Sequence, residues 1–210
     1  VPFNSSAKAC EAVSQVFRQG IMPSALEFIE RDAIDWTLRY SDIEMQIPDE
    51  VKAHLLVEVD GYDIDVLFKE CEKIANVMQR FDCGEILFAD NNSQKEQLWK
   101  IRRLVGEAVK ANSIYKEEDT VVPRAELAKL LKGVKEIGGK YGFKSVCYGH
   151  AGDGNLHVNI LKGTLSDEKW DNELPIAIRK LFKKVKELGG TLSGEHGIGL
   201  VQKEYMDIFF

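Results

Sequence analysis

The chain has 210 residues, of which 44% are hydrophobic and 30% are charged, and this composition excludes an intrinsically disordered protein. Its 28 Lys and Arg residues against 34 Asp and Glu residues give a net charge of −6, and an acidic surface argues against nucleic acid as a partner. No apolar stretch approaches the ~20 residues of a membrane-spanning helix, and four scattered cysteines indicate reduced thiols in a cytoplasmic protein.

Two helices are predicted at the start of the chain. Residues 5–20 follow a serine cap and stop at a glycine, and residues 23–39 begin with a proline, which is favoured in the first turn of a helix. The pattern changes after Pro48. We therefore expect residues 1–48 to form a helical lead-in and residues 49–210 to form one α+β domain.

Strands and helices alternate after this lead-in. The expected order is strand 54–59, helix 65–80, strand 85–89, helix 93–111, extended segment 114–122, helix 126–137, hairpin 144–161, helix 167–188 and a glycine-rich extended return over 189–199. The passes over residues 52–90 and 114–161 are loosely similar β-α-β passes. This pattern predicts an α+β fold in which an antiparallel or mixed sheet with ferredoxin-like pseudo-repeats is covered by helices.

The predicted hairpin contains two histidines that a tight turn brings together. In CYGHAGDGNLHVNI, residues 147–160, the Asp-Gly pair at 153–154 favours a two-residue turn. Such a turn places His150 directly opposite His157, with Cβ atoms roughly 4.5–5.5 Å apart, so that the two imidazoles can share a metal ion. A wider turn shifts this register. The isolated His54 is expected to have an ordinary structural role.

Further polar groups are expected beside the two histidines. In the same register Tyr148 lies opposite Asn159, which puts an amide next to the metal. In LSGEHGI, residues 192–198, Glu195 and His196 are adjacent and point in opposite directions in extended backbone. One of them can therefore bind the metal while the other faces a neighbouring pocket.

Two segments, GHAGDGNLH at 149–157 and GEHGIG at 194–199, resemble the paired signatures of a known family. They are similar to the C-terminal substrate domain of FAD-linked 2-hydroxy-acid oxidases and dehydrogenases. That family includes the glycolate oxidase D subunit, D-lactate dehydrogenases and D-2-hydroxyglutarate dehydrogenase. The likeness spans nearly the whole chain, because LWKIRR (98–103), IYKEEDTVVPR (114–124) and GGTLSGEHGIG (189–199) also occur in the family's order.

The resemblance implies that residues 49–210 bind substrate and metal in a flavin-dependent oxidoreductase. Such an enzyme oxidises a small D-2-hydroxy acid, of the glycolate or D-lactate type, to the 2-oxo acid with hydride transfer to FAD. The implied metal ligands are His150, His157 and Glu195. The implied substrate-binding residues are Arg102, Lys116 and Asn159. The implied catalytic residue, which accepts the hydroxyl proton, is His196.

The metal and the reaction class each have alternatives. Two histidines and one carboxylate leave open positions on a dication, and zinc fits this set best, although Mn(II) and Fe(II) also suit it. The same ligand set describes a zinc-dependent hydrolase, which is active without a second domain. A third alternative is a non-catalytic subunit of an oxidase complex, which would show no metal-dependent binding of 2-hydroxy acids.

The chain departs from the family pattern at both ends. By the resemblance, a flavin-binding domain that holds FAD is expected before Val1, and a final helix and tail are expected after Phe210. We therefore expect an excised piece that is inactive alone. Its expected partners are the flavin-binding domain of the same protein, a small 2-hydroxy acid and other oxidase subunits, through which a cytoplasmic protein can associate with a membrane. A related ether-lipid synthase branch has a run of histidines where this chain has Gly194-Glu195-His196, which argues against that branch.

Overall fold

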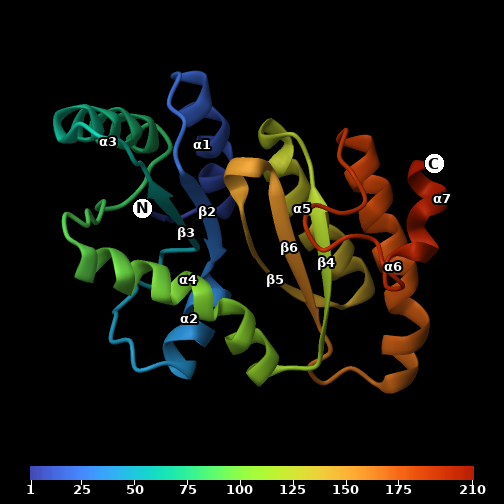
Figure 1. Cartoon of the computed structure of the whole chain (residues 1–210). Helices are drawn as coiled ribbons and strands as arrows, with labels where there is room; N and C mark the ends of the chain where they lie inside the picture. Colours follow the sequence, from blue (N-terminus) through green and yellow to red (C-terminus); the bar gives the residue numbers. More distant parts are fainter.

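The computed structural model describes residues 1–210, and its centre is a six-stranded sheet (Figure 1). The strand order is β1-β3-β2-β5-β6-β4, and every neighbouring pair is antiparallel. The strands are β1 (Pro2–Phe3), β2 (Ala25–Glu30), β3 (Ala53–Glu58), β4 (Tyr115–Val121), β5 (Lys144–Gly149) and β6 (Asn155–Leu161). The predicted α+β fold with an antiparallel sheet is therefore confirmed.

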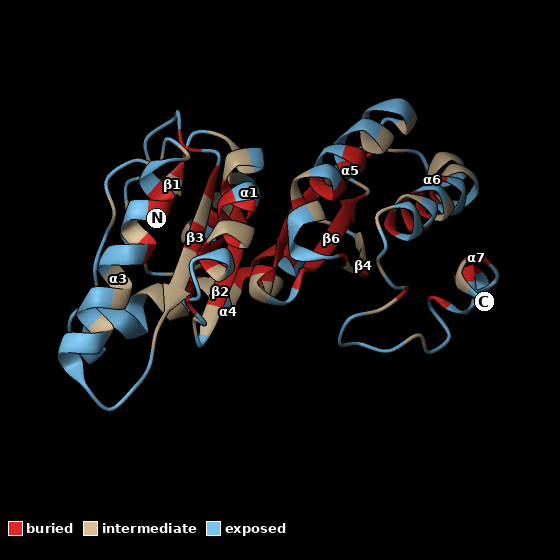
Figure 2. Ribbon diagram, turned by 90° about the horizontal axis from the view of Figure 1, so that it is seen from above, coloured by how far each residue is buried: buried red, intermediate tan, exposed pale blue.

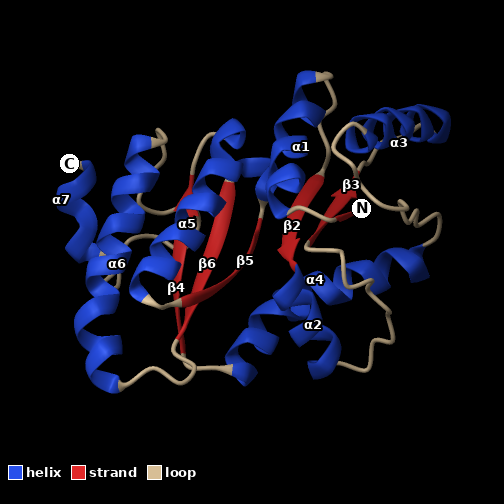
Figure 3. Ribbon diagram, turned by 180° about the vertical axis from the view of Figure 1, so that it is seen from behind, coloured by secondary structure: helices blue, strands red, loops and turns tan.

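Seven α-helices surround this sheet (Figure 3). They are α1 (Ser6–Arg18), α2 (Arg31–Tyr40), α3 (Ile64–Gln79), α4 (Asn92–Asn112), α5 (Leu127–Tyr141), α6 (Asp167–Glu187) and α7 (Met206–Phe209). Short 3-10 turns are η1 (Arg124–Glu126), η2 (Ala151–Asp153) and η3 (Lys203–Tyr205). None of the helices is both long enough and apolar enough to cross a membrane.

The two faces of the sheet are covered by different helices. On one face, sheet residues such as Phe28 and Leu156 pack with α1, α5 and α6 in a core of 34 buried residues. On the other face, Ile29 and Tyr148 pack with α2 and α4 in a smaller core of eight buried residues. Figure 2 shows the buried residues concentrated along the sheet between the helices. The second face is the one that carries the site described below.

The helix predicted over residues 23–39 is wrong in its first half. Residues 25–30 form β2, which pairs with β3 on one side and with β5 on the other. This strand is buried on both faces, so its sequence ALEFIE lacks the polar alternation that marks a half-exposed strand. Residues 1–48 consequently supply β1 and β2 to the same sheet that residues 49–210 complete.

The strand predicted over residues 85–89 is also wrong, so residues 52–90 contain β3 and α3 but no second strand. The neighbour of β3 at this edge of the sheet is β1, which pairs with it only at Ala53 and His54. The segment 85–89 instead connects α3 to α4, and Phe88 packs against Phe68 of α3 with ring centroids 5.7 Å apart. Side-chain packing rather than strand pairing therefore holds this apolar segment.

The β5–β6 hairpin forms as predicted, but its turn is wider than two residues. The 3-10 turn η2 and Gly154, whose φ is +78°, connect the strands. His157 consequently pairs with Tyr148 rather than with His150, and Asn159 pairs with Val146. The register has moved by two residues, and a shift of two keeps His157 and Asn159 on the same face of the sheet.

Other local predictions have mixed outcomes. The helix predicted over residues 126–137 continues to Tyr141, because the left-handed residue that ends it is Gly142, with φ +74°. All four cysteines are free, as predicted, and Cys10 and Cys147 are buried. Burial raises the pKa of the Cys147 thiol to about 12, so it remains an uncharged core residue.

A buried acid on β4 is expected to make stability depend on pH. Glu118 is fully buried on the α6 side of the sheet, and its Oε1 has no hydrogen-bond partner. Burial raises the pKa of Glu118 from 4.5 to about 7. The folded state therefore holds this proton between about pH 4.5 and pH 7 while the unfolded state releases it, so stability falls as the pH rises through this window.

Glu118→Gln removes this penalty. At pH 8 the variant is expected to be more stable than the parent chain by about 1–3 kcal/mol, whereas the two should be nearly equal below pH 4.5. Urea unfolding at both pH values measures the difference. Glu96→Gln, at an exposed position on α4, is the matched control. An equal effect of Glu118→Gln at both pH values would contradict the prediction.

Candidate active site

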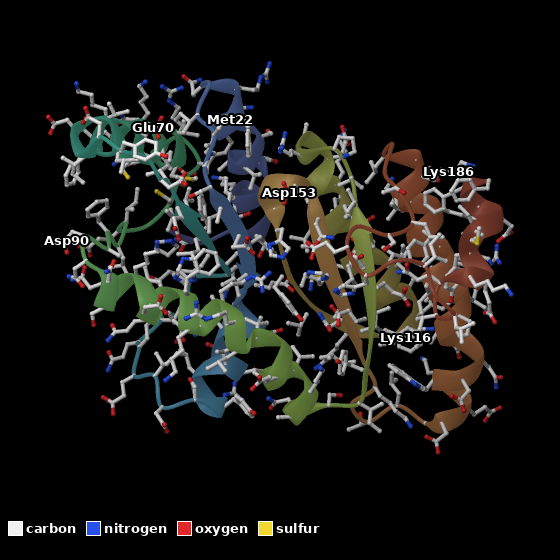
Figure 4. The ribbon with its side chains drawn as sticks, in the orientation of Figure 1. Met22, Glu70, Asp90, Lys116, Asp153 and Lys186 are labelled. Carbon is white, nitrogen blue, oxygen red and sulfur yellow. The ribbon has the colours of Figure 1, made fainter.

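Polar side chains from five segments meet on the face of the sheet that carries the smaller core. The segments are β2, β4, α4, the β5–β6 hairpin and the loop over residues 189–199. In Figure 4 the hairpin turn is marked by Asp153, and side chains crowd the space below it between α4 and β4.

Three of the residues singled out in the sequence lie together. The ligand atoms that His150, His157 and Glu195 can offer to a metal are all within 4.8 Å of one another. The Nε2 atom of His150 is 3.3 Å from Oε1 of Glu195, and the rings of the two histidines have centroids 6.0 Å apart. His150 lies just beyond β5 and reaches this position although it is not paired with His157.

Glu27 on β2 orients two groups of the site. Its side chain is 4% exposed, its Oε1 is 2.8 Å from Nδ1 of His150, and its Oε2 accepts a hydrogen bond from Nε of Arg102 at 2.7 Å. Burial alone raises the pKa of Glu27, but the hydrogen bond with His150 and the charge of Arg102 outweigh it, so the net pKa lies below the ordinary value. The same hydrogen bond raises the pKa of His150. A carboxylate that binds one ring nitrogen of a histidine leaves the other nitrogen directed at a metal position.

Asp119 on β4 holds the loop that carries Glu195. Its Oδ2 accepts hydrogen bonds from the Ser193 hydroxyl and from the backbone N–H groups of residues 194, 195 and 196, at 2.7–3.0 Å. Its Oδ1 accepts another from Asn155 at 2.6 Å. Burial raises the pKa of Asp119, but these donors outweigh it and lower the pKa to about 2. Any residue other than glycine at 194 would force these side chains to shift, because an added Cβ would lie 2.4 Å from the Asn155 amide nitrogen.

The His157 imidazole is kept neutral in the middle of the site. Burial lowers its pKa to about 4, although Asp119 acts in the opposite direction. Its Nδ1 lies 3.3 Å from Oε1 of Glu117 but makes no hydrogen bond. The His196 ring stacks on it, with centroids 5.1 Å apart and an interplanar angle of 17°. A neutral imidazole is the form that binds a metal.

Two predicted substrate-binding residues face the same space. The guanidinium of Arg102 lies over the Tyr148 ring at 5.3 Å, and only its Nε is hydrogen-bonded within the protein. Its two terminal amino groups remain free for an anion. Asn159 is fully buried, yet neither polar atom of its amide has a hydrogen-bond partner. A buried amide without partners indicates a place where a ligand completes the hydrogen bonds.

The third predicted substrate-binding residue, Lys116, is not brought to the site. On β4, the residues paired with Asn159 and His157 are Glu117 and Asp119, so Lys116 lies on the opposite face with Glu118. Its Nζ is 3.9 Å from Oε1 of Glu118. Figure 4 labels Lys116 toward the end of β4 away from the hairpin turn. The β4 residue beside it that does lie on the site face is Glu117.

Several groups of the site were missed in the sequence. Glu27 lies in a strand that was predicted to be helical, and nothing in ALEFIE distinguishes it as functional. Asp119 and Glu117 lie in the acidic run KEED, where the face of each residue depends on the register of β4. Strict alternation along the strand would have separated Glu117 and Asp119 from Lys116 and Glu118.

The donors fit a divalent metal ion. His150 has one nitrogen fixed by Glu27 and the other within 3.3 Å of a carboxylate oxygen, while the buried Nδ1 of His157 has no hydrogen bond. Neutral imidazoles with one carboxylate are ligands of zinc and of other first-row dications. Glu117, His157 and His196 form a second group of ligand atoms within 4.8 Å, which shares His157 with the first.

Asp119→Asn is expected to weaken metal binding by ~10–100-fold, because loosening the 193–196 loop releases Glu195 from its position. Competition with a chelator of known affinity measures the change. Asp153→Asn, at an exposed position in the hairpin turn, is the matched control. If Asp119→Asn binds metal as tightly as the control, the loop does not depend on this carboxylate.

Known proteins are similar to this chain in sequence and in fold. A family model described as FAD linked oxidases, C-terminal domain, matches residues 1–210. The D-lactate dehydrogenase of Anaerostipes hadrus is 28% identical over 211 residues, which cover 98% of this chain and 44% of that protein. The glycolate oxidase subunit GlcD of Bacillus subtilis is 31% identical over 203 residues, which cover 95% of this chain and 42% of that protein.

A solved structure has the same fold. An alkyldihydroxyacetonephosphate synthase matches with a TM-score of 0.55 and 12% identity, over 98% of this chain and 41% of that chain. At this identity the match concerns the fold alone. The chain spans less than half the length of each of these proteins.

Proposed function

Because the chain belongs to the family of FAD-linked oxidases, as their C-terminal domain, we propose that it binds the metal and the substrate of an FAD-dependent oxidoreductase acting on a small D-2-hydroxy acid. The observation that carries this proposal is the convergence of His150, His157 and Glu195 beside Arg102 and Asn159. A 2-hydroxy acid is an anion with a hydroxyl next to its carboxylate, so it needs both a cationic group and a polar group at short range. The activities named for two relatives, D-lactate dehydrogenase and glycolate oxidase subunit, support an acid of this size.

The proposed metal ligands are His150, His157 and Glu195, and zinc, Mn(II) or Fe(II) suits them. A dication bound there supplies a positive charge that lowers the pKa of the substrate hydroxyl. Glu27 fixes the ring of His150, and Asp119 fixes the backbone of Glu195. These two proposed ligands are therefore oriented before metal binds. His157 is held between strands β4 and β5.

The substrate carboxylate is proposed to bind Arg102. Its Nε is held by Glu27, which leaves a two-pronged contact for the terminal amino groups. The Tyr148 ring under the guanidinium restricts its movement. Asn159 then offers an amide to the hydroxyl or carboxylate oxygen that faces β6.

His196 is the proposed proton acceptor. Oxidation of a 2-hydroxy acid removes the hydroxyl proton and the hydrogen on C2, which leaves with its electron pair, so that the hydroxyl carbon becomes a carbonyl. The His196 ring, stacked on His157 and exposed, can take the proton. FAD, held by a flavin-binding domain, is the acceptor for the hydride.

Metal analysis and calorimetry test this function. The chain is expected to retain close to one equivalent of zinc, Mn(II) or Fe(II), and to bind glycolate, D-lactate or D-2-hydroxyglutarate only when the metal is present. Removal of the metal with a chelator should abolish this binding, and its return should restore it. Binding that does not depend on metal, or no binding of any of the three acids, would overturn the proposal.

A further inference from the structure

Glu117 is an acidic group of the site that the metal-ligand set does not use. It lies on β4, directly paired with Asn159 of β6, and its carboxylate faces His157 at 3.3 Å. The ligand atoms of Glu117, His157 and His196 are within 4.8 Å of one another, so this carboxylate borders the space between the proposed metal and the proposed proton acceptor. Its side chain is only 26% exposed.

The other buried acids on this face have their charges matched by donors. Glu27 is paired with Arg102 and His150, and Asp119 accepts from five donors. Glu117 makes no hydrogen bond, and its only ion-pair contact within 4.0 Å is with Nδ1 of His157, at 3.3 Å. The negative charge of its carboxylate therefore acts on a substrate bound in the site.

We propose that Glu117 makes the site selective for 2-hydroxy acids that carry a single carboxylate. The inference rests on the proposed function. In this proposal Arg102 binds the first carboxylate of the substrate, and Asn159 binds the substrate beside it. Glu117 is paired with Asn159 across the sheet, so the group that extends from C2 lies next to Glu117. A second carboxylate there meets a like charge in a partly buried site, whereas a hydrogen or a methyl group does not.

The Coulomb repulsion between two carboxylates roughly 6 Å apart near a protein surface corresponds to about a hundredfold in affinity without salt, and screening at physiological ionic strength reduces this to about tenfold. D-Lactate and D-malate are suitable probes, because malate is lactate with a second carboxylate on its methyl carbon. The chain loaded with Mn²⁺ is expected to bind D-lactate about tenfold more tightly than D-malate. Both dissociation constants are measured by calorimetry at one ionic strength.

Glu117→Gln keeps the shape of the side chain and removes its charge. This variant is expected to bind D-malate about tenfold more tightly than the parent chain does, while its affinity for D-lactate changes by less than about threefold. Glu107→Gln, which removes the same charge from an exposed position on α4, is the matched control and should leave the ratio unchanged.

The affinity for Mn²⁺, measured on the same samples, is the second readout. It should stay within a few-fold of the parent value in Glu117→Gln, because Glu117 is not proposed as a ligand. A large loss of Mn²⁺ would show that Glu117 binds the metal and would overturn the inference. An unchanged lactate-to-malate ratio in Glu117→Gln would overturn it and leave the proposed function standing, whereas binding of neither acid to the parent chain would overturn both.

Discussion

Replacing His157 by alanine is expected to weaken metal binding by more than ~100-fold. The loss of a residue that only hydrogen-bonds to a metal ligand costs ~10–100-fold, and His157 is proposed as a ligand itself. His157 is the most buried of the three proposed ligands and belongs to both groups of ligand atoms in the site. Its removal therefore leaves no complete three-residue set for a dication. Metal content after dialysis, measured by elemental analysis, gives the result directly.

A folded variant is needed for this result to be informative. His54→Ala removes a histidine that lies on β3 and makes no contribution to either group of ligand atoms, so it controls for the loss of an imidazole from the sheet. Circular dichroism of both variants should match that of the parent chain. Full metal content in a folded His157→Ala variant would remove the basis of the proposed function.

Replacing His196 by alanine, in a protein that joins this chain to the proposed flavin-binding domain, is expected to lower turnover by ~10²-fold or more while metal content stays the same. The side chain is proposed to take the hydroxyl proton, and its ring stacks on His157 without being one of the three proposed ligands. Loss of a positioned base slows the step in which C2 is oxidised but leaves the donors for the dication in place. Stopped-flow reduction of the flavin by D-lactate measures that step.

The His196 prediction separates two roles for this residue. If flavin reduction stays near the parent rate, His196 is not the proton acceptor. If the variant loses its metal, the residue is a ligand through the second group of atoms, with Glu117 and His157. Ser193→Ala, which removes one hydrogen bond from the same loop, controls for a general loosening of residues 193–196.

The parts of the site that were predicted from sequence lie in segments with distinctive residues. The turn pair Asp153-Gly154 predicted a hairpin that brings two histidines together, and a hairpin forms. The turn is wider than predicted because a 3-10 turn is inserted, and sequence alone does not distinguish the two. The predicted register is wrong by two residues, which is an even number. His157 therefore lies on the predicted face of the sheet, and the predicted group of ligands still comes together.

The parts that were not predicted depend on tertiary pairing. β2 is a central strand with both faces covered, and its short apolar run has no period that separates a strand from a helix. Because this strand was not predicted, Glu27, which orients His150 and Arg102, was not predicted as a residue of the site. For β4, KEED contains charged residues on both faces, so the choice between Lys116 and Glu117 required the pairing with β6.

The carboxylate of Asp119 receives the backbone N–H groups of both Glu195 and His196 on a single oxygen atom. Any displacement of the loop that preserves these bonds carries the backbone of both residues together. The proposed metal ligand and the proposed proton acceptor therefore extend from backbone positions that are both tied to one atom of β4.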